Sequence, residues 1–174
     1  MQVNQHRKIP FKYFSPAELE VLENALWVAE DLVSNHYKMT KSQWLKNRYD
    51  VKTLKDLFPY EITEGPFAQV IRYEGKPIDS ELLSSSYDFY KICIQDHAIL
   101  NKLDEEKCID LYPFSLYIIT HELIHIVRFA KFLQNYSASE YEKEAEEKRV
   151  HEKTIEILSG ISAPGLETIF SFYV

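Results

Sequence analysis

The sequence predicts a mostly helical α+β domain with a small antiparallel sheet, and three observations support this class. Hydrophobic residues make up 45% of the 174 residues and aromatic residues 14%, which is enough for a real core. Long segments with apolar residues at helical spacing flank two short segments rich in aromatic and β-branched residues. Glycine occurs four times, which disfavours Gly-rich phosphate loops and all-β folds with many tight turns. Because no repeat, linker or low-complexity segment interrupts the chain, we expect residues 1–174 to form one domain.

The first half of the chain begins with a strong helix signal. Ser15 is followed by Pro16 at the first helical position and by Glu18 three residues after the serine, which is the pattern of a capping box. Apolar residues then recur at helical spacing, at Leu19, Leu22, Leu26, Ala29 and Val33. The sequence therefore predicts a helix over residues 16–36, followed by a shorter one over "KSQWLKNR", residues 41–48.

The middle of the chain predicts a connector and two strands. The segment "FPYEITEGP", residues 58–66, holds two prolines and a glycine and is typical of a connector. The segments "FAQVIRYEGKP", residues 67–77, and "YDFYKICIQDHAIL", residues 87–100, are rich in the residue types that favour strands. We expect these two strands to pair antiparallel, in a register that the sequence does not define.

The second half of the chain predicts two more helices. The first is almost wholly apolar, "YPFSLYIITHELIHIVRFAKFL", residues 112–133, with Pro113 near its start. The second begins with another capping box, formed by Ser139 and Glu142, and we expect Gly160 to be its C-cap. The tail that follows, "ISAPGLETIFSFYV", is apolar enough to pack on the body of the domain.

Charge and cysteine content narrow the expected partners and location. The net charge of −7, without a basic stripe, makes nucleic acid an unexpected partner. The first residues, "MQVNQHRKIPFKYF", contain no apolar stretch and no small-residue cleavage site, and the chain has two cysteines, so we expect a cytoplasmic protein with reduced thiols. The run at residues 112–133 is long enough to span a bilayer, but its charged residues are costly in lipid. We therefore expect a buried helix and no contact with a membrane.

Two histidines and a glutamate in this apolar helix indicate a metal site. His121 and His125 are four residues apart, so both imidazoles leave the same face of the helix, one turn from each other. Their ring nitrogens can then bind one zinc ion at about 2 Å each. Glu122 lies beside them and can take a proton from a water molecule that attacks a carbonyl group. Without such a partner, the three polar side chains would be costly to bury.

The segment "HELIH", His121 to His125, resembles the HExxH signature of the zincin metallopeptidases. The resemblance covers about forty residues, from this helix to the next. It implies a minimal zincin-like fold, one zinc ion per chain, a peptide or protein substrate, and Glu122 as the general base. In zincins an edge strand lies along the cleft and pairs with an extended substrate. Residues 67–73 or 90–96 could form that strand.

The HExxH motif leaves the third metal ligand undefined. The metzincin form, HExxHxxGxxH, does not match, because its glycine and third histidine are absent. The gluzincin form takes a glutamate from a following helix, so the acidic segment at residues 140–147 offers candidates. The inward arc of that helix is defined by Val150, Thr154, Ile157, Leu158 and Ile161. Glu147 falls inside this arc and is the first choice, while Glu144 and His151 flank it and remain alternatives.

Two polar residues near the motif have more than one possible role. In gluzincin-like enzymes the residue one turn after the ligand glutamate is often an aspartate that supports a zinc histidine. This chain departs from that pattern with His151, which could support a ligand, donate to an oxyanion or bind the metal itself. Arg128, three residues after His125, could hold the third-ligand carboxylate or a substrate carbonyl, or could pair with the acidic helix. The oxyanion donor stays open among Tyr117, Tyr136, Tyr141 and His151.

Three alternatives compete with a zinc peptidase. A zincin-like protein could bind metal in a regulatory role without turnover. A ferritin-like di-iron site needs a second Glu-x-x-His, and no histidine other than His125 has a glutamate three residues before it. The histidines could instead be neutral and hydrogen-bonded in the core, with Glu122 paired to Arg128. The substrate and the oligomeric state stay open.

Overall fold

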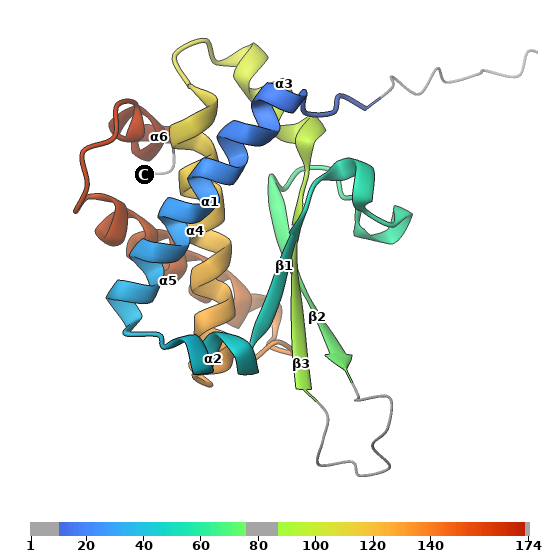
Figure 1. Ribbon diagram of the computed structural model, residues 1–174, viewed down its shortest axis with the longest axis vertical. Coiled ribbons are helices and arrows are strands. Elements are labelled where there is room, and N and C mark those ends of the chain that lie inside the picture. The colour runs from blue at the N-terminus through green and yellow to red at the C-terminus, as the bar shows by residue number, and fades with distance from the viewer. Residues whose placement is uncertain (1–10, 76–86, 173–174) are drawn as a thin grey trace, which may run out of the picture.

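The computed structural model describes residues 11–75 and 87–172 as a group of helices packed beside a small sheet (Figure 1). The helices are α1 (Pro16–Tyr37), α2 (Lys41–Lys46), α3 (Asp96–Glu105), α4 (Leu111–Ala130), α5 (Glu140–Leu158) and α6 (Leu166–Phe172). The strands are β1 (Arg48–Lys52), β2 (Ala68–Gly75) and β3 (Tyr87–Ile94), and β1 and β2 are separated by the 3₁₀ helices η1 (Leu54–Asp56) and η2 (Pro59–Glu61). This arrangement confirms a mostly helical α+β class.

The sheet is mixed, with β3 in the centre and the strand order β1-β3-β2. β2 pairs with β3 antiparallel, with Val70 opposite Ile92, as predicted for the two aromatic segments. The prediction of a purely antiparallel sheet is wrong, because β1 pairs with β3 in parallel, with Val51 opposite Ile92. β1 begins at Arg48, inside the segment predicted to be helical. Parallel strands are joined by long connections, so no local turn signal indicates this pairing.

The second predicted strand is too long, because α3 replaces its end. β3 stops at Ile94, and α3 begins at Asp96. The carboxylate of Asp96 is buried and accepts the backbone N–H groups of Phe14 and Leu54, at 3.0 and 2.9 Å. These contacts bind the segment before α1 and the start of η1 to one side chain, and they define where the chain leaves the sheet.

The two predicted capping boxes are both present. Ser15 Oγ accepts the N–H of Glu18 at 3.3 Å, and the Glu18 carboxylate accepts the N–H of Ser15 at 2.7 Å. Ser139 and Glu142 make the same two hydrogen bonds at the start of α5, at 3.3 and 2.8 Å. Local hydrogen bonds therefore define where α1 and α5 begin.

Other helix ends differ from prediction by a few residues. The C-cap of α5 is Ser159, so the prediction of Gly160 is wrong by one residue, and Gly160 does not adopt a positive φ. α4 begins at Leu111, two residues before Pro113, and ends at Ala130. The proline is tolerated there because the first turn of a helix needs no intrahelical N–H donor.

α4 is the central element of the molecule and contacts α1, α5, α6 and β2. Figure 1 shows α1 and α4 side by side, with α5 next to them and the sheet on the other side. Most residues of α4 are buried, including Glu122 and His125. The core packing around this helix therefore holds the "HELIH" segment in place and limits its access to water.

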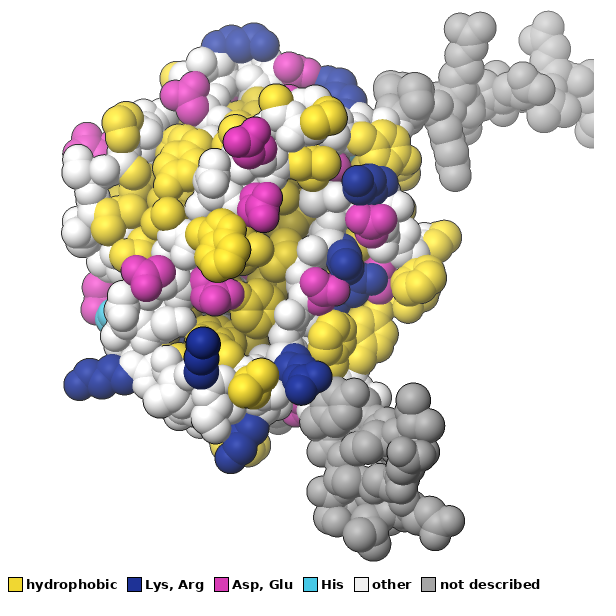
Figure 2. Space-filling model, viewed as in Figure 1, with side chains coloured by type: hydrophobic (Ala, Val, Ile, Leu, Met, Phe, Trp, Pro, Cys, Tyr) yellow, Lys and Arg dark blue, Asp and Glu magenta, His cyan; other side chains and the backbone are white. Residues whose placement is uncertain are grey.

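The surface view in Figure 2 shows charged side chains of both signs spread among hydrophobic ones. On this face, Lys and Arg side chains form no continuous patch among the residues drawn in colour. In the described part of the chain, none of the helices has both the length and the apolar character needed to cross a membrane. The expected absence of a nucleic-acid partner stays a prediction.

Candidate metal centre

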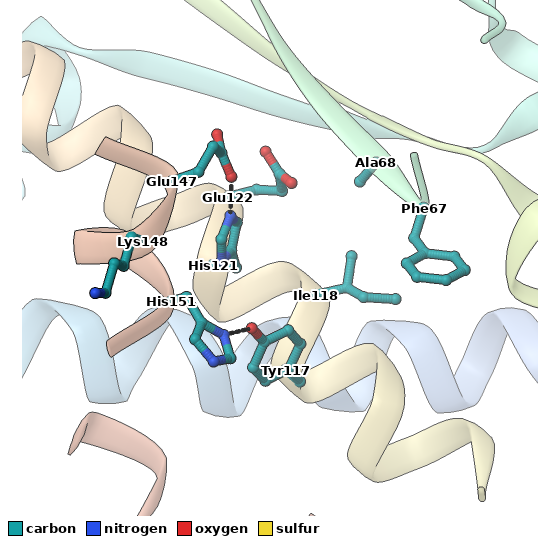
Figure 3. Close-up of a pocket in the computed structure, with 9 residues that line it drawn as sticks. All are labelled: Phe67, Ala68, Tyr117, Ile118, His121, Glu122, Glu147, Lys148 and His151. Carbon is teal, nitrogen blue, oxygen red and sulfur yellow. Dashed lines mark hydrogen bonds and ion pairs between the residues drawn. The ribbon is translucent and has the colours of Figure 1, made fainter. Parts of the chain in front are cut away.

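Three side chains from α4 and α5 converge on one point. His121 Nε2 lies 3.2 Å from His125 Nε2 and 3.1 Å from Glu147 Oε2, and His125 Nε2 lies 3.0 Å from Glu147 Oε1. Figure 3 shows Glu147 of α5 directed at His121 of α4. Within residues 11–75 and 87–172, this is the one group of His, Cys, Asp or Glu side chains whose ligand atoms could hold a metal ion together. The structure thus brings together the two histidines and the glutamate that was our first choice.

The spacing of these donor atoms fits a tetrahedral zinc ion. Zinc binds nitrogen and oxygen ligands at about 2.0–2.2 Å, and tetrahedral geometry then separates neighbouring ligand atoms by about 3.3–3.5 Å. The two imidazole nitrogens lie 3.2 Å apart, which is close to that value. The two oxygens of the Glu147 carboxylate face one imidazole each, at 3.0 Å from His125 Nε2 and 3.1 Å from His121 Nε2. Two imidazoles and a carboxylate are also the ligand set of zinc sites that keep a fourth position open. The residues present therefore fit the metal that the sequence predicts.

Gln134 orients one of the two histidines. Its Oε1 accepts a hydrogen bond from His125 Nδ1 at 3.0 Å. Because an amide oxygen can only accept, neutral His125 carries its proton on Nδ1, and the lone pair of Nε2 faces Glu147 and His121. Metal binding requires this tautomer, and a partner of this kind also restricts the ring. Sequence reasoning missed Gln134, because it lies in the loop after α4 and no motif spacing identifies it.

The charges of the site attract a cation. Burial would raise the pKa of Glu147, but its hydrogen bonds to His121 and His125 outweigh burial and hold that pKa well below its ordinary value. Burial would lower the pKa of His125, but the hydrogen bond to Glu147 and the charges of Glu122 and Glu147 raise it to about 9. The negative charges that favour a proton on His125 would also favour a metal cation between the same nitrogen and oxygen atoms.

Glu122 faces this space without a donor of its own. The residue is 8% exposed, and its carboxylate accepts no hydrogen bond from any residue that the structure describes. Burial raises the pKa of Glu122, whereas the charges of His121 and His125 lower it, and Glu147 raises it further. A buried carboxylate without a donor is costly, and such groups are common at functional sites.

Two of the residues predicted for the site lie outside this group. Arg128 pairs with Glu146 through its Nε and through Nη2, the latter at 3.2 Å. It therefore holds neither Glu147 nor Glu122, and of its predicted roles the pairing with the acidic helix is the one observed. Adjacent residues of a helix differ by about 100° in direction, so Glu146 turns toward Arg128 while Glu147 turns toward the histidines. Glu144 is exposed and does not belong to the converging group.

His151 lies one turn beyond Glu147 on α5 and has a different partner. Its Nδ1 shares a hydrogen bond with the hydroxyl of Tyr117, which lies one turn before His121 on α4. Figure 3 shows this pair beside His121, on the wall of the same pocket. His151 is not one of the three converging side chains, and together with Tyr117 it forms a second polar pair next to them.

The converging side chains lie where two hollows along β2 meet. Both hollows are bordered by Ala68, Glu122 and Glu147. One has a volume of about 450 Å³ and extends toward Tyr117. The other has a volume of about 470 Å³ and extends toward Gln134. The side chain of Glu147 is 60% exposed, so solvent reaches the site through this groove.

No family model, curated protein or solved structure matches the chain. Its own fold and site therefore indicate what kind of protein this is. The protein is mostly helical with a small mixed sheet, and two histidines and a glutamate gather beside a buried second glutamate. The resemblance to zincins rests on the "HELIH" segment.

Proposed function

We propose that this protein is a zinc-dependent hydrolase of the zincin type, acting as a peptidase. The observation that carries the proposal is the convergence of His121, His125 and Glu147 beside Glu122 in the groove. The two Nε2 atoms lie 3.2 Å apart, and each lies 3.0 or 3.1 Å from one oxygen of Glu147. The three converging residues would hold one zinc ion per chain. Glu122 would be the general base, as the HExxH resemblance implies.

Glu122 provides the proton transfer in this proposal. A bound zinc ion would supply Lewis acidity, which lowers the pKa of a water molecule and polarises a substrate carbonyl. Glu122 takes the proton of the attacking water and then donates it to the leaving amine. Burial raises the pKa of Glu122 above its ordinary value, which makes the carboxylate a stronger base. Gln134 keeps His125 in the tautomer that binds a metal.

The free edge of β2 supports an extended peptide as the substrate. The N–H of Gln95 donates to the carbonyl of Phe67 at 2.9 Å, so these two residues form a hydrogen-bonded pair of the antiparallel ladder. Such pairs alternate with non-bonded pairs, so Ala68 and Val70 direct their backbone N–H and C=O groups away from β3. Both residues border the groove, and these groups have no partner among the described residues. An extended peptide can bind them as an added strand.

Tyr117 and His151 are the residues we assign to the oxyanion. They line the same hollow as Glu122 and share a hydrogen bond one helical turn from His121 and Glu147. Either can donate a hydrogen bond to an oxygen that gains negative charge as the carbonyl is attacked. Tyr141, another candidate, is 82% exposed and does not line the groove.

Zinc content is the first test of this proposal. Wild-type protein, purified without a nickel column, should contain about one zinc ion per chain by elemental mass spectrometry. His121→Ala should contain almost none. His36→Ala, which removes an exposed histidine at the end of α1, should match the wild type. A wild-type protein that neither carries nor takes up zinc would reduce the three side chains to a hydrogen-bonded cluster and end the hydrolase proposal.

Turnover is the second test. Glu122→Gln should keep the zinc and lower the rate of peptide cleavage by about 10²–10⁴-fold, because the base is lost while the ligands remain. Zinc without cleavage of any peptide in the wild type would favour the alternative of a zincin-like metal-binding or regulatory protein. Two iron ions per chain would favour the di-iron alternative.

A further inference from the structure

The hollow toward Tyr117, called the apolar hollow from here on, fits a large apolar side chain. Its apolar walls are Phe67, Ala68 and Ile118, and its volume is about 450 Å³. Phe67 is held in place by an edge-to-face contact with buried Phe114, with ring centroids 4.9 Å apart. Figure 3 shows Phe67, Ala68 and Ile118 across the pocket from the metal-binding side chains. An apolar group that enters this hollow leaves water for contact with these three side chains. The rest of the lining is polar and includes His121, Glu122, Glu147, Lys148 and His151.

The hollow toward Gln134, called the polar hollow, has a different lining and continues toward Arg72. Its polar side chains are Gln69, Gln134, Asn135, Tyr136 and Lys143. A further hollow of about 490 Å³ shares part of this lining and reaches Arg72, and it is also lined by the carboxylates of Asp88, Glu142 and Glu146. Arg72 is exposed, lies 5.0 Å from the centre of the Tyr136 ring, and forms no ion pair with a described residue. Lys143 and Arg149, the other cations of this hollow, are already paired with glutamates of α5.

β2 runs from the apolar hollow to Arg72 at the other end of the groove. Four of the residues that border the groove lie along this segment: Phe67 directly before β2, and Ala68, Val70 and Arg72 within it. Five residue steps of an extended strand span about 17 Å, which is also the length of about five residues of an extended peptide. The free edge closes at Arg72, whose N–H donates to the hydroxyl of Tyr136 at 3.5 Å. A peptide paired with Ala68 and Val70 therefore reaches both ends.

From this asymmetry we propose that the site selects extended peptides that carry a large apolar residue beside the cleaved bond, in the apolar hollow, and an acidic residue about four positions from it, at Arg72. The inference rests on the proposed hydrolase function and adds the substrate class to it. The apolar residue provides most of the affinity, because burying an aromatic side chain stabilises a complex more than an exposed ion pair does. Arg72 adds a selectivity that decreases with salt.

Peptide binding to the zinc-loaded, full-length Glu122→Gln protein tests the proposal without turnover. The parent probes are fluorescein-labelled heptapeptides with a central Ala-Gly pair. Phe stands directly on one side of the pair, and Asp stands two positions beyond the pair on the other side. Each probe is made in this order and in the reversed order. Matched probes carry Ser in place of Phe, or Asn in place of Asp. By fluorescence polarisation, one chain order should bind at least about 10-fold more tightly than its Ser analogue and about 3-fold more tightly than its Asn analogue. The second ratio should approach one at about 0.5 M salt.

Substitutions assign each preference to its end of the groove. Ile118→Phe fills the apolar hollow and Phe67→Ser removes one of its walls, so each should abolish the preference for Phe over Ser and retain that for Asp. Phe67 is half-buried, so this variant keeps the test decisive if the change at buried Ile118 prevents folding. Arg72→Glu should reverse the preference for Asp. Lys55→Glu changes the net charge equally at an exposed residue outside the three hollows and should leave that preference unchanged.

Zinc content distinguishes the failure of this inference from the failure of the proposed function. If neither the wild type nor Glu122→Gln binds zinc, the proposed function falls, and the substrate class falls with it. If zinc is present at about one ion per chain and all probes bind with the same affinity, the substrate class is overturned while the metal site stands. The proposed substrate class is also overturned if the preference for Phe over Ser persists in both Phe67→Ser and Ile118→Phe.

Discussion

Two buried polar clusters of this protein contain similar residues but differ in how their charges are balanced. In the first, the fully buried Glu61 accepts Lys91 Nζ at 2.7 and 2.9 Å, the Tyr73 hydroxyl at 2.7 Å and the Phe58 N–H at 2.9 Å. One ammonium group neutralises one carboxylate, and both carboxylate oxygens have donors. We call these four residues the Glu61 cluster.

The candidate metal centre lacks this balance. Glu122 and Glu147 bring two carboxylates, and no lysine or arginine of the described residues forms an ion pair with either. The side chains that face them are the imidazoles of His121 and His125. Two negative charges match one divalent cation. In its absence a proton is drawn to His125, and the pKa rises to about 9.

The difference separates a cluster that stabilises the fold from one that binds a ligand. A buried carboxylate persists where the protein or a ligand supplies opposite charge and hydrogen-bond donors. In the Glu61 cluster the protein supplies both. At the candidate metal centre it supplies donor atoms for a cation beside an open groove. Substitutions in the first cluster should therefore change the free energy of unfolding, and substitutions in the second should change metal binding.

The largest effect is expected for Glu147→Ala, which removes one of three proposed ligands. Most of the bound zinc should be lost, as measured by elemental mass spectrometry. The free energy of unfolding of the zinc-free protein should change by about 1 kcal/mol or less, because 60% of the side chain is exposed. Glu144→Ala removes an exposed glutamate from the same helix and should keep the zinc. Full zinc retention in Glu147→Ala would instead give the third ligand to His151 or Glu144.

The opposite pattern is expected for Lys91→Met in the Glu61 cluster. This change leaves Glu61 buried without its cation, so the free energy of unfolding should fall by about 3–5 kcal/mol in urea titrations of the zinc-free protein. Zinc content should stay near one ion per chain. The double variant Glu61→Gln, Lys91→Met should recover part of the loss, because no buried charge remains. A variant that kept its stability and lost its zinc would erase the distinction between the two clusters.

The fold could be predicted where local interactions decide it. The capping boxes at Ser15 and Ser139 act within three residues, and helical periodicity acts within a few turns, so α1, α4 and α5 are visible in the sequence. β1 is five residues long and is stabilised by parallel pairing with a strand about forty positions away. The end of β3 depends on Asp96, whose partners also come from distant segments. No local pattern encodes those contacts.

The candidate site was predictable to the same extent. The "HELIH" spacing and the periodicity of α5 identify His121, His125 and Glu147, which the structure brings together. Gln134 and the bond between Tyr117 and His151 depend on how the loop after α4 and helix α5 pack against α4. The helical periodicity also could not show which of two adjacent carboxylates Arg128 would bind, because that depends on the angle between the helices.

A moderate effect is expected at Gln134, the neutral partner of His125. Gln134→Leu removes the acceptor for Nδ1–H, so the imidazole loses its preferred tautomer and orientation. Zinc affinity, measured by competition with a chelating dye, should fall by about 10–100-fold. Gln134→Glu keeps an acceptor at the same place and should bind zinc at least as tightly as the wild type. Equal affinities in all three proteins would show that His125 is oriented by core packing alone.

The smallest effect is expected in the acid stability that the Glu61 cluster contributes. Burial would raise the pKa of Glu61, but hydrogen bonds from Lys91, Tyr73 and the Phe58 N–H outweigh it and lower the pKa below its ordinary value of 4.5. The stabilisation is therefore present above about pH 4.5 and is lost as the pH falls through the lower, folded-state pKa. Urea titrations of the zinc-free protein between about pH 7 and 3 should show a larger loss of stability in the wild type than in Glu61→Gln, which has no proton to bind at this position. If the free energies of unfolding of the two proteins changed with pH in parallel, Glu61 would have the same pKa in the folded and the unfolded chain. The hydrogen bonds from Lys91, Tyr73 and the Phe58 N–H would then only offset the cost of burying the carboxylate.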